Sequence, residues 1–294
     1  MNKYYEFAYN NRGLVLYKTE EYDKAIEDFS RAIQINKDYG QAFYYLGLTR
    51  YKLEEYDKAI EDFSRAIQLN VNSAKIYHNR GLANYKIGRY RAAITDYTKA
   101  IELDANYVDA FYNRGNAKYN LKDNSGAISD YEMAIKLDSN YIFALYNLGI
   151  LRYDSDDYRG AIELFTKAIK LNPNSPLTYN NRANSYYQLG EYQRAIADYT
   201  KAIELDANYL QAFYNRGIAN YQLAKYSAAI EDYTKAIELD ANYIPALYNR
   251  ALALYQIGRK ETAIKDWELL ADFYSSQGKT TQYNEITALI RQYQ

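Results

Sequence analysis

The stretch LQAFYNRGIANYQLAKYSAAIEDYTKAIELDANY, residues Leu210–Tyr243, decides the fold, because variants of it follow one another along almost the whole chain. Its last part, DYTKAIELDANY, occurs identically from Asp96, Asp198 and Asp232. A fixed period of 34 residues is typical of solenoids, in which one supersecondary unit is stacked many times. Counting in this period predicts eight repeats, at residues 6–39, 40–73, 74–107, 108–141, 142–175, 176–209, 210–243 and 244–277.

Each repeat reads as two amphipathic helices when its residues are numbered from 1 to 34, with Leu210 as position 1 of repeat 7. Apolar and small residues recur at positions 4, 8 and 12, and again at positions 17, 20, 21, 24, 27 and 28, with the spacing of helix faces. Position 8 is Gly in six repeats and Ala in two, whereas position 24 carries a large side chain. We expect the small residue to let the two helices approach and the large one to fill the adjoining space.

This pattern resembles the tetratricopeptide repeat family, whose period is the same. Repeat 7 is similar to the family motif at Phe213, Gly217, Tyr226, Ala229, Tyr233 and Ala236, and the match covers residues 6 to about 277. The resemblance implies an all-α, right-handed superhelical solenoid whose first helices line a concave groove, used for binding other proteins. The family's proline near position 32 survives only as Pro173, and the eighth repeat departs most from the motif.

The chain after the eighth repeat predicts a cap. Gly278 interrupts the pattern, and residues 279–294 predict a last helix with Tyr283, Ile286, Leu289 and Ile290 on one face. Because a terminal repeat lacks a neighbour on one side, we expect this helix to cover repeat 8 near Trp267. No linker or change of composition divides residues 1–294, which predicts a single solenoid domain.

Charged residues at positions 7 and 23 vary together. Position 7 is Arg in six repeats and position 23 is Asp in seven, and repeat 5 loses both, with Leu148 and Leu164. Repeat 2 is the exception, with Leu46 opposite Asp62. The joint loss predicts that Arg and Asp pair between the two helices of one repeat, since a half-buried Arg needs a partner. The alternative is that the arginines bind a ligand.

Asparagine dominates position 6, which the family resemblance places on the concave face. An amide offers donors and an acceptor, which suits a peptide backbone bound without regard to its side chains. Asn is a poor helix former, so its recurrence at one position indicates a role beyond helix propensity. The alternative is that an exposed helix position merely tolerates it. The candidate binding residues are Asn11, Asn79, Asn113, Asn147, Asn181, Asn215 and Asn249.

Tyrosine and lysine supply the other candidate columns. Tyrosine provides contact area with little entropy to lose, and at position 5 it occurs as Tyr44, Tyr112, Tyr146, Tyr214 and Tyr248. Position 12 is Tyr in every repeat, where either ligand contact or packing between repeats explains it. Position 13 is Lys18, Lys52 and Lys86 in the first three repeats, which predicts a preference for acidic ligand residues unless it is only a solvated face. These phases differ from the family's carboxylate clamp for chaperone tails, which disfavours that function.

Other chemistry is sparse in this sequence. The formal charge of −1 does not favour nucleic acid or anionic membranes, and the chain has no cysteine for disulfides or thiol chemistry. The single histidine, His78, makes a histidine-based metal cluster or triad implausible, and no phosphate-binding glycine loop is present. An acidic cluster of Asp154, Asp156 and Asp157 favours a solvated turn over a cation site. We therefore expect no cofactor and no metal.

The sequence thus predicts a non-enzymatic scaffold that binds an extended peptide or flexible segment of another protein. Self-assembly is the main alternative, because near-identical repeats make end-to-end contacts easy. RNA binding is disfavoured by the neutral charge, and a glycan-binding surface built on the tyrosines is a further alternative. No apolar run long enough to span a bilayer and no signal-peptide pattern occurs, which favours a cytoplasmic protein.

Overall fold

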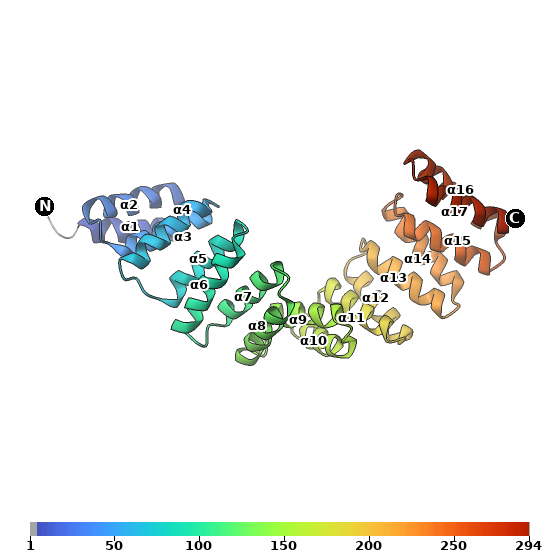
Figure 1. Ribbon diagram of the computed structural model, residues 1–294, viewed down its shortest axis with the longest axis horizontal. Helices are drawn as coiled ribbons and strands as arrows, with labels where there is room; N and C mark the ends of the chain where they lie inside the picture. The colour runs from blue at the N-terminus through green and yellow to red at the C-terminus, as the bar shows by residue number, and fades with distance from the viewer. Residues whose placement is uncertain (1–4, 294) are drawn as a thin grey trace. The chain divides into compact units, whose positions relative to one another are not determined.

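The computed structural model describes residues 5–293, and every regular element in that range is an α-helix (Figure 1). The helices pair into hairpins, so that each repeat contributes a first and a second helix and the chain ends on an extra one. In chain order they are α1 Tyr5–Lys18, α2 Tyr22–Ile35, α3 Gly40–Lys52, α4 Tyr56–Gln68, α5 Ala74–Lys86, α6 Tyr90–Leu103, α7 Val108–Asn120, α8 Asn124–Leu137, α9 Ile142–Asp154, α10 Tyr158–Leu171, α11 Pro176–Gln188, α12 Tyr192–Leu205, α13 Leu210–Gln222, α14 Tyr226–Leu239, α15 Ile244–Gln256, α16 Lys260–Ser276 and α17 Thr280–Tyr293.

The turn inside each hairpin has the same backbone conformation in all eight repeats. Position 15 adopts a positive φ throughout, as glycine at Gly88, Gly190 and Gly258 and as a non-glycine residue at Glu20, Glu54, Lys122, Asp156 and Ala224. A residue in this left-handed conformation ends an α-helix by turning its chain away from the helix axis. The three glycines therefore end first helices at no steric cost, and five other repeats accept the same strained conformation with a side chain.

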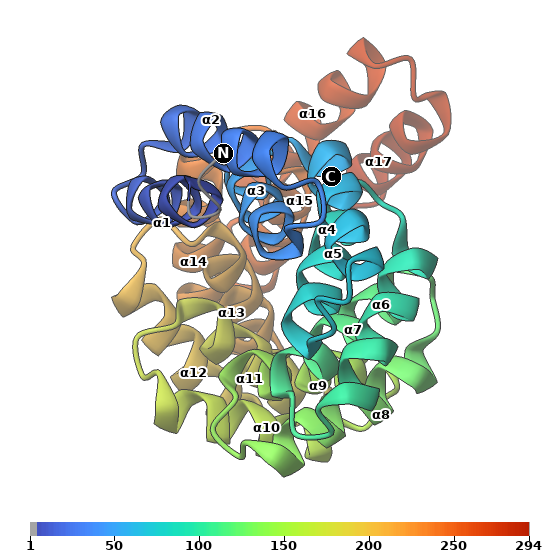
Figure 2. The ribbon, with the colours of Figure 1, turned by 90° about the vertical axis from the view of Figure 1, so that its left-hand side faces the viewer.

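The chain divides into two compact units, Met1–Ala144 and Leu145–Gln294, with the division inside α9. Within unit 1 each second helix packs against the next first helix, as α2 does against α3, α4 against α5 and α6 against α7. Unit 2 continues this order from α10 against α11 to α16 against α17, and Figure 2 shows the hairpins of each unit lying in succession. The single solenoid domain expected over residues 1–294 stays a prediction.

Small residues bring the two helices of a hairpin together, as expected. A Cβ added to Gly217 would lie 2.6 Å from Cε1 of Tyr233, which is closer than real Cβ contacts come. A Cβ added to Gly115 would lie 2.7 Å from Cε1 of Tyr131. The alanine at position 20 is fully buried, for example Ala229 at 0% exposure. The large ring at position 24 thus lies directly on the glycine, which confirms the packing predicted from the two columns.

The arginine and aspartate columns form the predicted ion pairs between the helices of one hairpin. Arg182 donates through Nε and Nη2 to both oxygens of Asp198, at 2.7 and 2.8 Å. The remaining Nη1 donates at 3.0 Å to Oγ1 of Thr166, at position 25 of the preceding repeat. Equivalent pairs join Arg12 to Asp28, Arg80 to Asp96, Arg114 to Asp130, Arg216 to Asp232 and Arg250 to Asp266. The arginines are therefore structural, because planar bidentate pairing satisfies the buried carboxylates.

Repeat 2 keeps its pair by a different route. Leu46 stands where arginine is usual, but Arg50 lies one helical turn further along the same face and donates from Nη1 to Oδ2 of Asp62 at 2.7 Å. The single contact is weaker than the bidentate pairs, and burial raises the pKa of Asp62 to about 7. Comparing only positions 7 and 23 of each repeat missed Arg50, because Arg50 is at position 11 of repeat 2.

Helix α17 covers the last repeat, with one difference from expectation. Ile286 and Ile290 are buried against Trp267 and Leu270, and Leu289 packs at the edge of the same cluster. Tyr283 is 37% exposed, so it does not belong to the apolar face as predicted. Tyr293 takes that part, with its ring stacked 5.3 Å from the Trp267 ring. The helix begins at Thr280 instead of 279, and residue 294 lies outside the described residues.

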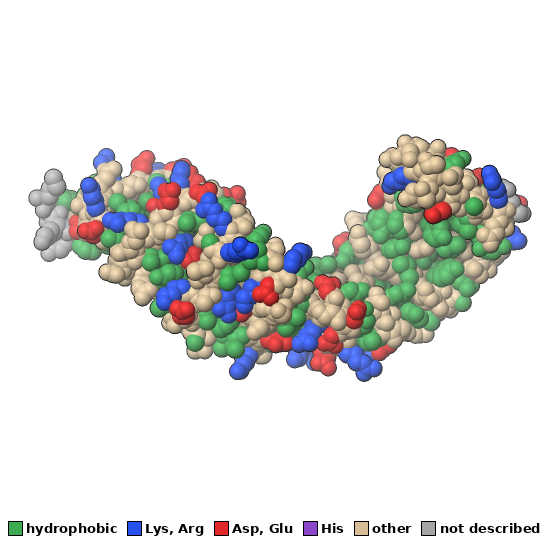
Figure 3. Space-filling model, in the orientation of Figure 1, with side chains coloured by type: hydrophobic (Ala, Val, Ile, Leu, Met, Phe, Trp, Pro, Cys, Tyr) green, Lys and Arg blue, Asp and Glu red, His purple; other side chains and the backbone are tan. Residues whose placement is uncertain are grey.

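Charge is unevenly distributed over the surface. In the view of Figure 3, lysine, arginine, aspartate and glutamate side chains are dense over unit 1, whereas unit 2 presents a broad area of apolar and tyrosine side chains. No helix between residues 5 and 293 is long and apolar enough to cross a membrane.

Candidate functional site

The surface formed by the first helices of unit 2 contains two adjoining cavities. One, of about 360 Å³, is lined by Tyr146, Ile150, Tyr153, Asp154, Phe165, Leu177, Asn181 and Asn184. The other, of about 260 Å³, is lined by Tyr153, Asn184, Tyr187, Gln188, Tyr199, Asn215 and Ile218. Apart from Phe165 and Tyr199 of the second helices, every lining residue comes from position 2, 5, 6, 9, 12 or 13 of a first helix. We call this surface the first-helix face, and the family resemblance predicted it.

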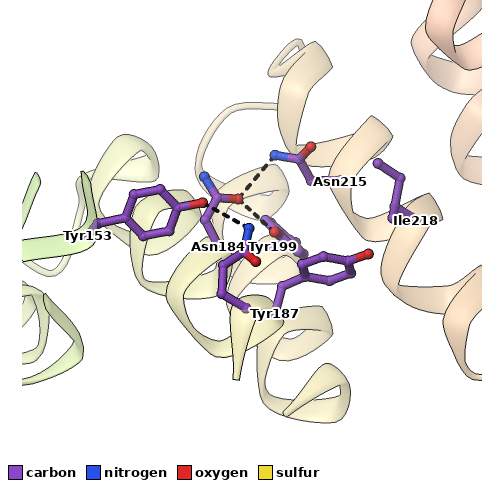
Figure 4. Close-up of a pocket in the computed structure, with 7 residues that line it drawn as sticks. Tyr153, Asn184, Tyr187, Tyr199, Asn215 and Ile218 are labelled. Atoms are coloured by element: carbon purple, nitrogen blue, oxygen red, sulfur yellow. Dashed lines mark hydrogen bonds between the residues drawn. The ribbon is translucent and has the colours of Figure 1, made fainter. Parts of the chain in front are cut away.

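Asn184 lines both cavities, and Figure 4 shows it among the residues that line the second one. Its Oδ1 accepts the hydroxyl of Tyr199 at 2.7 Å and also Nδ2 of Asn215 at 3.2 Å. Position 9 carries Leu, Ile or Asn in different repeats, so it forms no uniform column in the sequence. Asn184 is therefore a candidate binding residue that the sequence-based prediction missed.

The asparagine column at position 6 is bonded to the repeat before it. The Nδ2 groups of Asn79, Asn181 and Asn249 donate to the hydroxyls of Tyr44, Tyr146 and Tyr214, at 3.1, 2.8 and 3.1 Å. Each of these acceptors is the position-5 residue 35 places earlier in the chain. The amides thus link successive repeats, a role that the sequence did not indicate. One N–H of each of these amides is used in this way, and the side-chain oxygen is not part of these bonds.

The remaining members of the column follow related arrangements. Nδ2 of Asn113 contacts Nε2 of His78 at 3.0 Å, and Asn215 lies 3.5 Å from Oδ1 of Asn180. Asn147 is half-buried, as are the other interior asparagines, whereas Asn11 is exposed because α1 has no preceding helix among the described residues. The seven candidates therefore lie on one face within each unit, at differing exposure.

The tyrosines at position 12 form a second set of links. Nε2 of Gln188 donates to the hydroxyl of Tyr153 at 3.3 Å, and Nδ2 of Asn120 donates to Tyr85 at 2.9 Å. In six repeats the ring also packs against a tyrosine at position 17 of its own repeat, as Tyr153 does against Tyr158 with centroids 5.4 Å apart. Hydrogen bonds between repeats therefore account for Tyr85 and Tyr153, while Tyr153 and Tyr187 also line a cavity.

The position-5 tyrosines differ in accessibility. Tyr44, Tyr112, Tyr146 and Tyr214 are half-buried, whereas Tyr248 is 37% exposed. Burial raises the pKa of Tyr44, Tyr146 and Tyr214, so their hydroxyls stay protonated and can donate. Tyr146 lines one of the adjoining cavities, and Tyr214 and Tyr248 line a separate one near α17.

Lys18, Lys52 and Lys86 are exposed at the C-terminal ends of α1, α3 and α5. None of the three forms an ion pair with another residue in the described range 5–293. In repeats 4 and 6 the same position carries the amides that bond to the preceding tyrosine. The three lysines thus present free cations, whereas Asn120 and Gln188 form neutral links at the same position.

The acidic turn of repeat 5 serves the backbone. Asp157 accepts the backbone N–H of Gly160 at 3.0 Å and so caps α10, while Asp156 accepts the Tyr158 hydroxyl. Within residues 5–293 no group of three or more His, Cys, Asp or Glu side chains is arranged to hold a metal ion. Asp156 and Asp157 therefore stabilise the turn of repeat 5 and the start of α10.

Comparisons with known proteins identify the repeats. Models described as tetratricopeptide repeat match residues 7–39, 108–141, 176–209, 210–243 and 232–265, and one described as TPR repeat matches 49–88, 85–122 and 151–190. Among curated proteins no match is found.

Several solved structures are similar to this chain. The protein YrrB, described as a TPR protein with an unusual peptide-binding site, is 24% identical, with a TM-score of 0.59 over 64% of this chain and 97% of its own. MamA is 27% identical, with a TM-score of 0.56 over 58% and 94%. The C-terminal part of a TPR protein from Cytophaga hutchinsonii is 23% identical, with a TM-score of 0.61 over 84% and 93%. At these identities, YrrB and the Cytophaga protein show the fold alone.

Proposed function

Because this chain belongs to the tetratricopeptide repeat family, we propose that it is a non-enzymatic scaffold that binds an extended peptide or flexible segment of another protein on its first-helix face. The family and its fold are typical of protein–protein interaction. The observation that carries the proposal is the pair of adjoining cavities in unit 2, lined almost wholly by first-helix residues.

The cavities supply the two kinds of contact that an extended segment needs. Tyrosine rings and aliphatic side chains such as Ile150, Leu177 and Ile218 offer area for side chains of the ligand. The amides of Asn181 and Asn215 offer their oxygens, and Asn184 offers its N–H groups, to the backbone of the ligand. Because bonds such as Asn181–Tyr146 fix the amides in place before binding, little entropy is lost on the protein side.

The first test places a carboxylate in one of these cavities. Leu177, 47% exposed, lines the cavity between α9 and α11, whereas Leu171, 43% exposed, lines neither cavity. Peptides selected from a random displayed library on the wild-type protein are expected to bind Leu177→Asp at least about tenfold more weakly, because an unpaired carboxylate would face the ligand. Leu171→Asp should bind them with unchanged affinity in fluorescence anisotropy.

Equal binding by both variants would place the peptide elsewhere on the protein, and a library that yields no binder would count against the proposed function. Circular dichroism melting of both variants controls for stability. The asparagines serve as a second probe, since Asn113→Ala/Asn147→Ala/Asn181→Ala should weaken the same peptides if the amides hold the ligand backbone.

The lysine column of unit 1 predicts a ligand preference. Removing its free cations in Lys18→Ala/Lys52→Ala/Lys86→Ala is expected to lower the proportion of Asp and Glu in peptides that the library selects. For acidic peptides bound by the wild type, affinity should fall as salt rises from 0.05 to 0.5 M, which screens exposed charges, roughly as Debye theory requires. Selection of equally acidic peptides by the triple variant would contradict the preference while leaving peptide binding itself intact.

A further inference from the structure

In repeats 3, 4, 6, 7 and 8 the arginine at position 7 of the first helix bonds to a Ser or Thr of the preceding repeat, and the asparagine at position 6 bonds beside it. In repeat 8, Ala246 and Ala253 are fully buried against repeat 7. Asn249 donates to the hydroxyl of Tyr214 at 3.1 Å, and Nη1 of Arg250 donates to Oγ1 of Thr234 at 3.3 Å. Two small residues, one amide and one guanidinium N–H thus form the contact between repeats.

Helix α1 carries the same groups with nothing in the described structure to receive them. Its counterparts of the four docking residues are Ala8, Asn11, Arg12 and Val15, which we call the head face. Val15 is 60% exposed, whereas Ala253 at the same position is at 0%. The Arg12 side chain is 66% exposed, against 20% for Arg250. Asn11 and Nη1 of Arg12 make no hydrogen bond to another residue between 5 and 293. The head face thus keeps the amide and the guanidinium of the docking set, carries Val15 in place of the second alanine, and meets no docking partner among residues 5–293.

The last repeat offers the matching acceptors. Counting one period on from Tyr214 and Thr234 gives Tyr248 and Glu268, which with Trp267 and Leu270 we call the tail face. Helix α17 covers Trp267 and Leu270 through Ile286 and Ile290. It leaves Tyr248 37% exposed and Glu268 exposed, and neither side chain forms a hydrogen bond or ion pair with another described residue. A cavity of about 530 Å³ also lies between Tyr248, Pro245 and the α17 residues Glu285 and Leu289. The cap therefore fills the place of a ninth repeat incompletely.

We propose that the head face of one copy docks on the tail face of a second copy in place of α17, joining chains head to tail. Asn11 would meet Tyr248 as Asn249 meets Tyr214, and Nη1 of Arg12 would meet the Glu268 carboxylate where Arg250 meets a threonine. A carboxylate is the stronger acceptor for a guanidinium. The interface continues a contact already present between the repeats of one chain. Because head and tail differ, each added copy leaves one head face and one tail face for a further copy.

The test opens the cap and then blocks each face separately. Ile286→Glu/Ile290→Glu, the cap-opened variant, should lift α17 and lower the concentration at which the full chain associates by at least about tenfold in sedimentation velocity. In that background Val15→Glu blocks the head and Glu268→Lys blocks the tail, so either change should abolish association. Mixing the head-blocked and tail-blocked proteins should give a dimer that grows no further, because one good head meets one good tail.

Several results would overturn the proposal. Monomeric cap-opened protein at all concentrations would do so, as would association unaffected by Val15→Glu or a mixture that stays monomeric. A contact between two head faces would survive Glu268→Lys, so this variant distinguishes head-to-head from head-to-tail association. Leu171→Glu, which changes an exposed apolar residue of α10 that lines neither cavity and belongs to neither face, controls for a general loss of apolar surface. Should the cap-opened protein lose its helical circular dichroism, the same single changes are made with α17 intact, where concentrated wild type should associate and both variants should not.

Discussion

Replacing Arg216 with leucine is expected to lower the free energy of unfolding by about 3–5 kcal/mol, the usual cost of removing one partner from a buried ion pair. Asp232 is only 4% exposed and receives Nη2 of Arg216 at 2.6 Å. Burial raises the pKa of Asp232, and the hydrogen bonds from Arg216 and Asn220 act against that rise. Without the guanidinium the carboxylate would have to be buried unpaired or take up a proton, so the loss should increase from pH 5 to pH 8.

The paired replacement Arg216→Leu/Asp232→Leu should recover most of that loss. Repeat 5 already carries this combination, with Leu148 4% exposed and Leu164 half-buried, which shows that the hairpin accommodates two leucines. Urea unfolding followed by circular dichroism, with hydrogen exchange of α13 and α14 to localise the change, provides the measurement. Lys235→Leu, which removes only an exposed pair with Glu238, should cost within about 1 kcal/mol. A double variant as unstable as Arg216→Leu alone would contradict the argument.

The ion pairs show how far covariation among repeats can predict structure. The joint loss at Leu148 and Leu164 was enough to predict that arginine and aspartate are partners, since internal repeats sample the same environment several times. The comparison of positions 7 and 23 failed in repeat 2, where Arg50 supplies the missing cation from one turn further along the helix. Comparison by position detects substitution at a site but not a partner that reaches the site from another position.

The sequence predicted which residues form the candidate binding columns but not the hydrogen bonds that they make. The period placed the asparagines on one face. It could not show that Nδ2 of Asn181 donates to the Tyr146 hydroxyl, because that bond depends on how closely successive first helices approach. Asn184 escaped notice for the opposite reason: its position varies among repeats, although its side chain lines both cavities. Sequence periodicity therefore identifies the first-helix face, and only side-chain geometry separates links between repeats from groups left for a ligand.

The cap was predicted in position and mistaken in detail. Helical spacing favoured Tyr283 on the buried face, but its side chain is 37% exposed. Tyr293 stacks on Trp267 instead. A helix that follows a regular array has no neighbouring copy against which its register can be checked, so periodicity alone could not fix its contacts.

Acidification is expected to destabilise unit 1 through His78, the only histidine. The ring is 7% exposed, with Nε2 3.0 Å from Nδ2 of Asn113 and Nδ1 3.1 Å from the Tyr107 hydroxyl. Because Nδ2 of Asn113 donates, Nε2 accepts and the ring is neutral. Burial lowers the pKa of His78 from 6.5 to about 4. The imidazole of the unfolded chain therefore takes up its proton first as pH falls.

The sign and size of the effect follow from that difference in pKa. Stability from the neutral His78 is fully present above pH 6.5 and is lost as pH falls from 6.5 towards 4, by about 3 kcal/mol in total. Carboxylates titrate in part of the same range, so the informative quantity is the difference between wild type and His78→Tyr, which places at position 5 the residue that Tyr44 and Tyr146 already provide there. Urea unfolding at about pH 7.5, above this window, and at about pH 4.5, near its lower end, should show a larger loss of stability for the wild type than for His78→Tyr. A histidine NMR titration with a midpoint near 6.5 would contradict the prediction, because a ring held neutral by burial and by the donation of Asn113 cannot protonate at the pKa of a solvated imidazole.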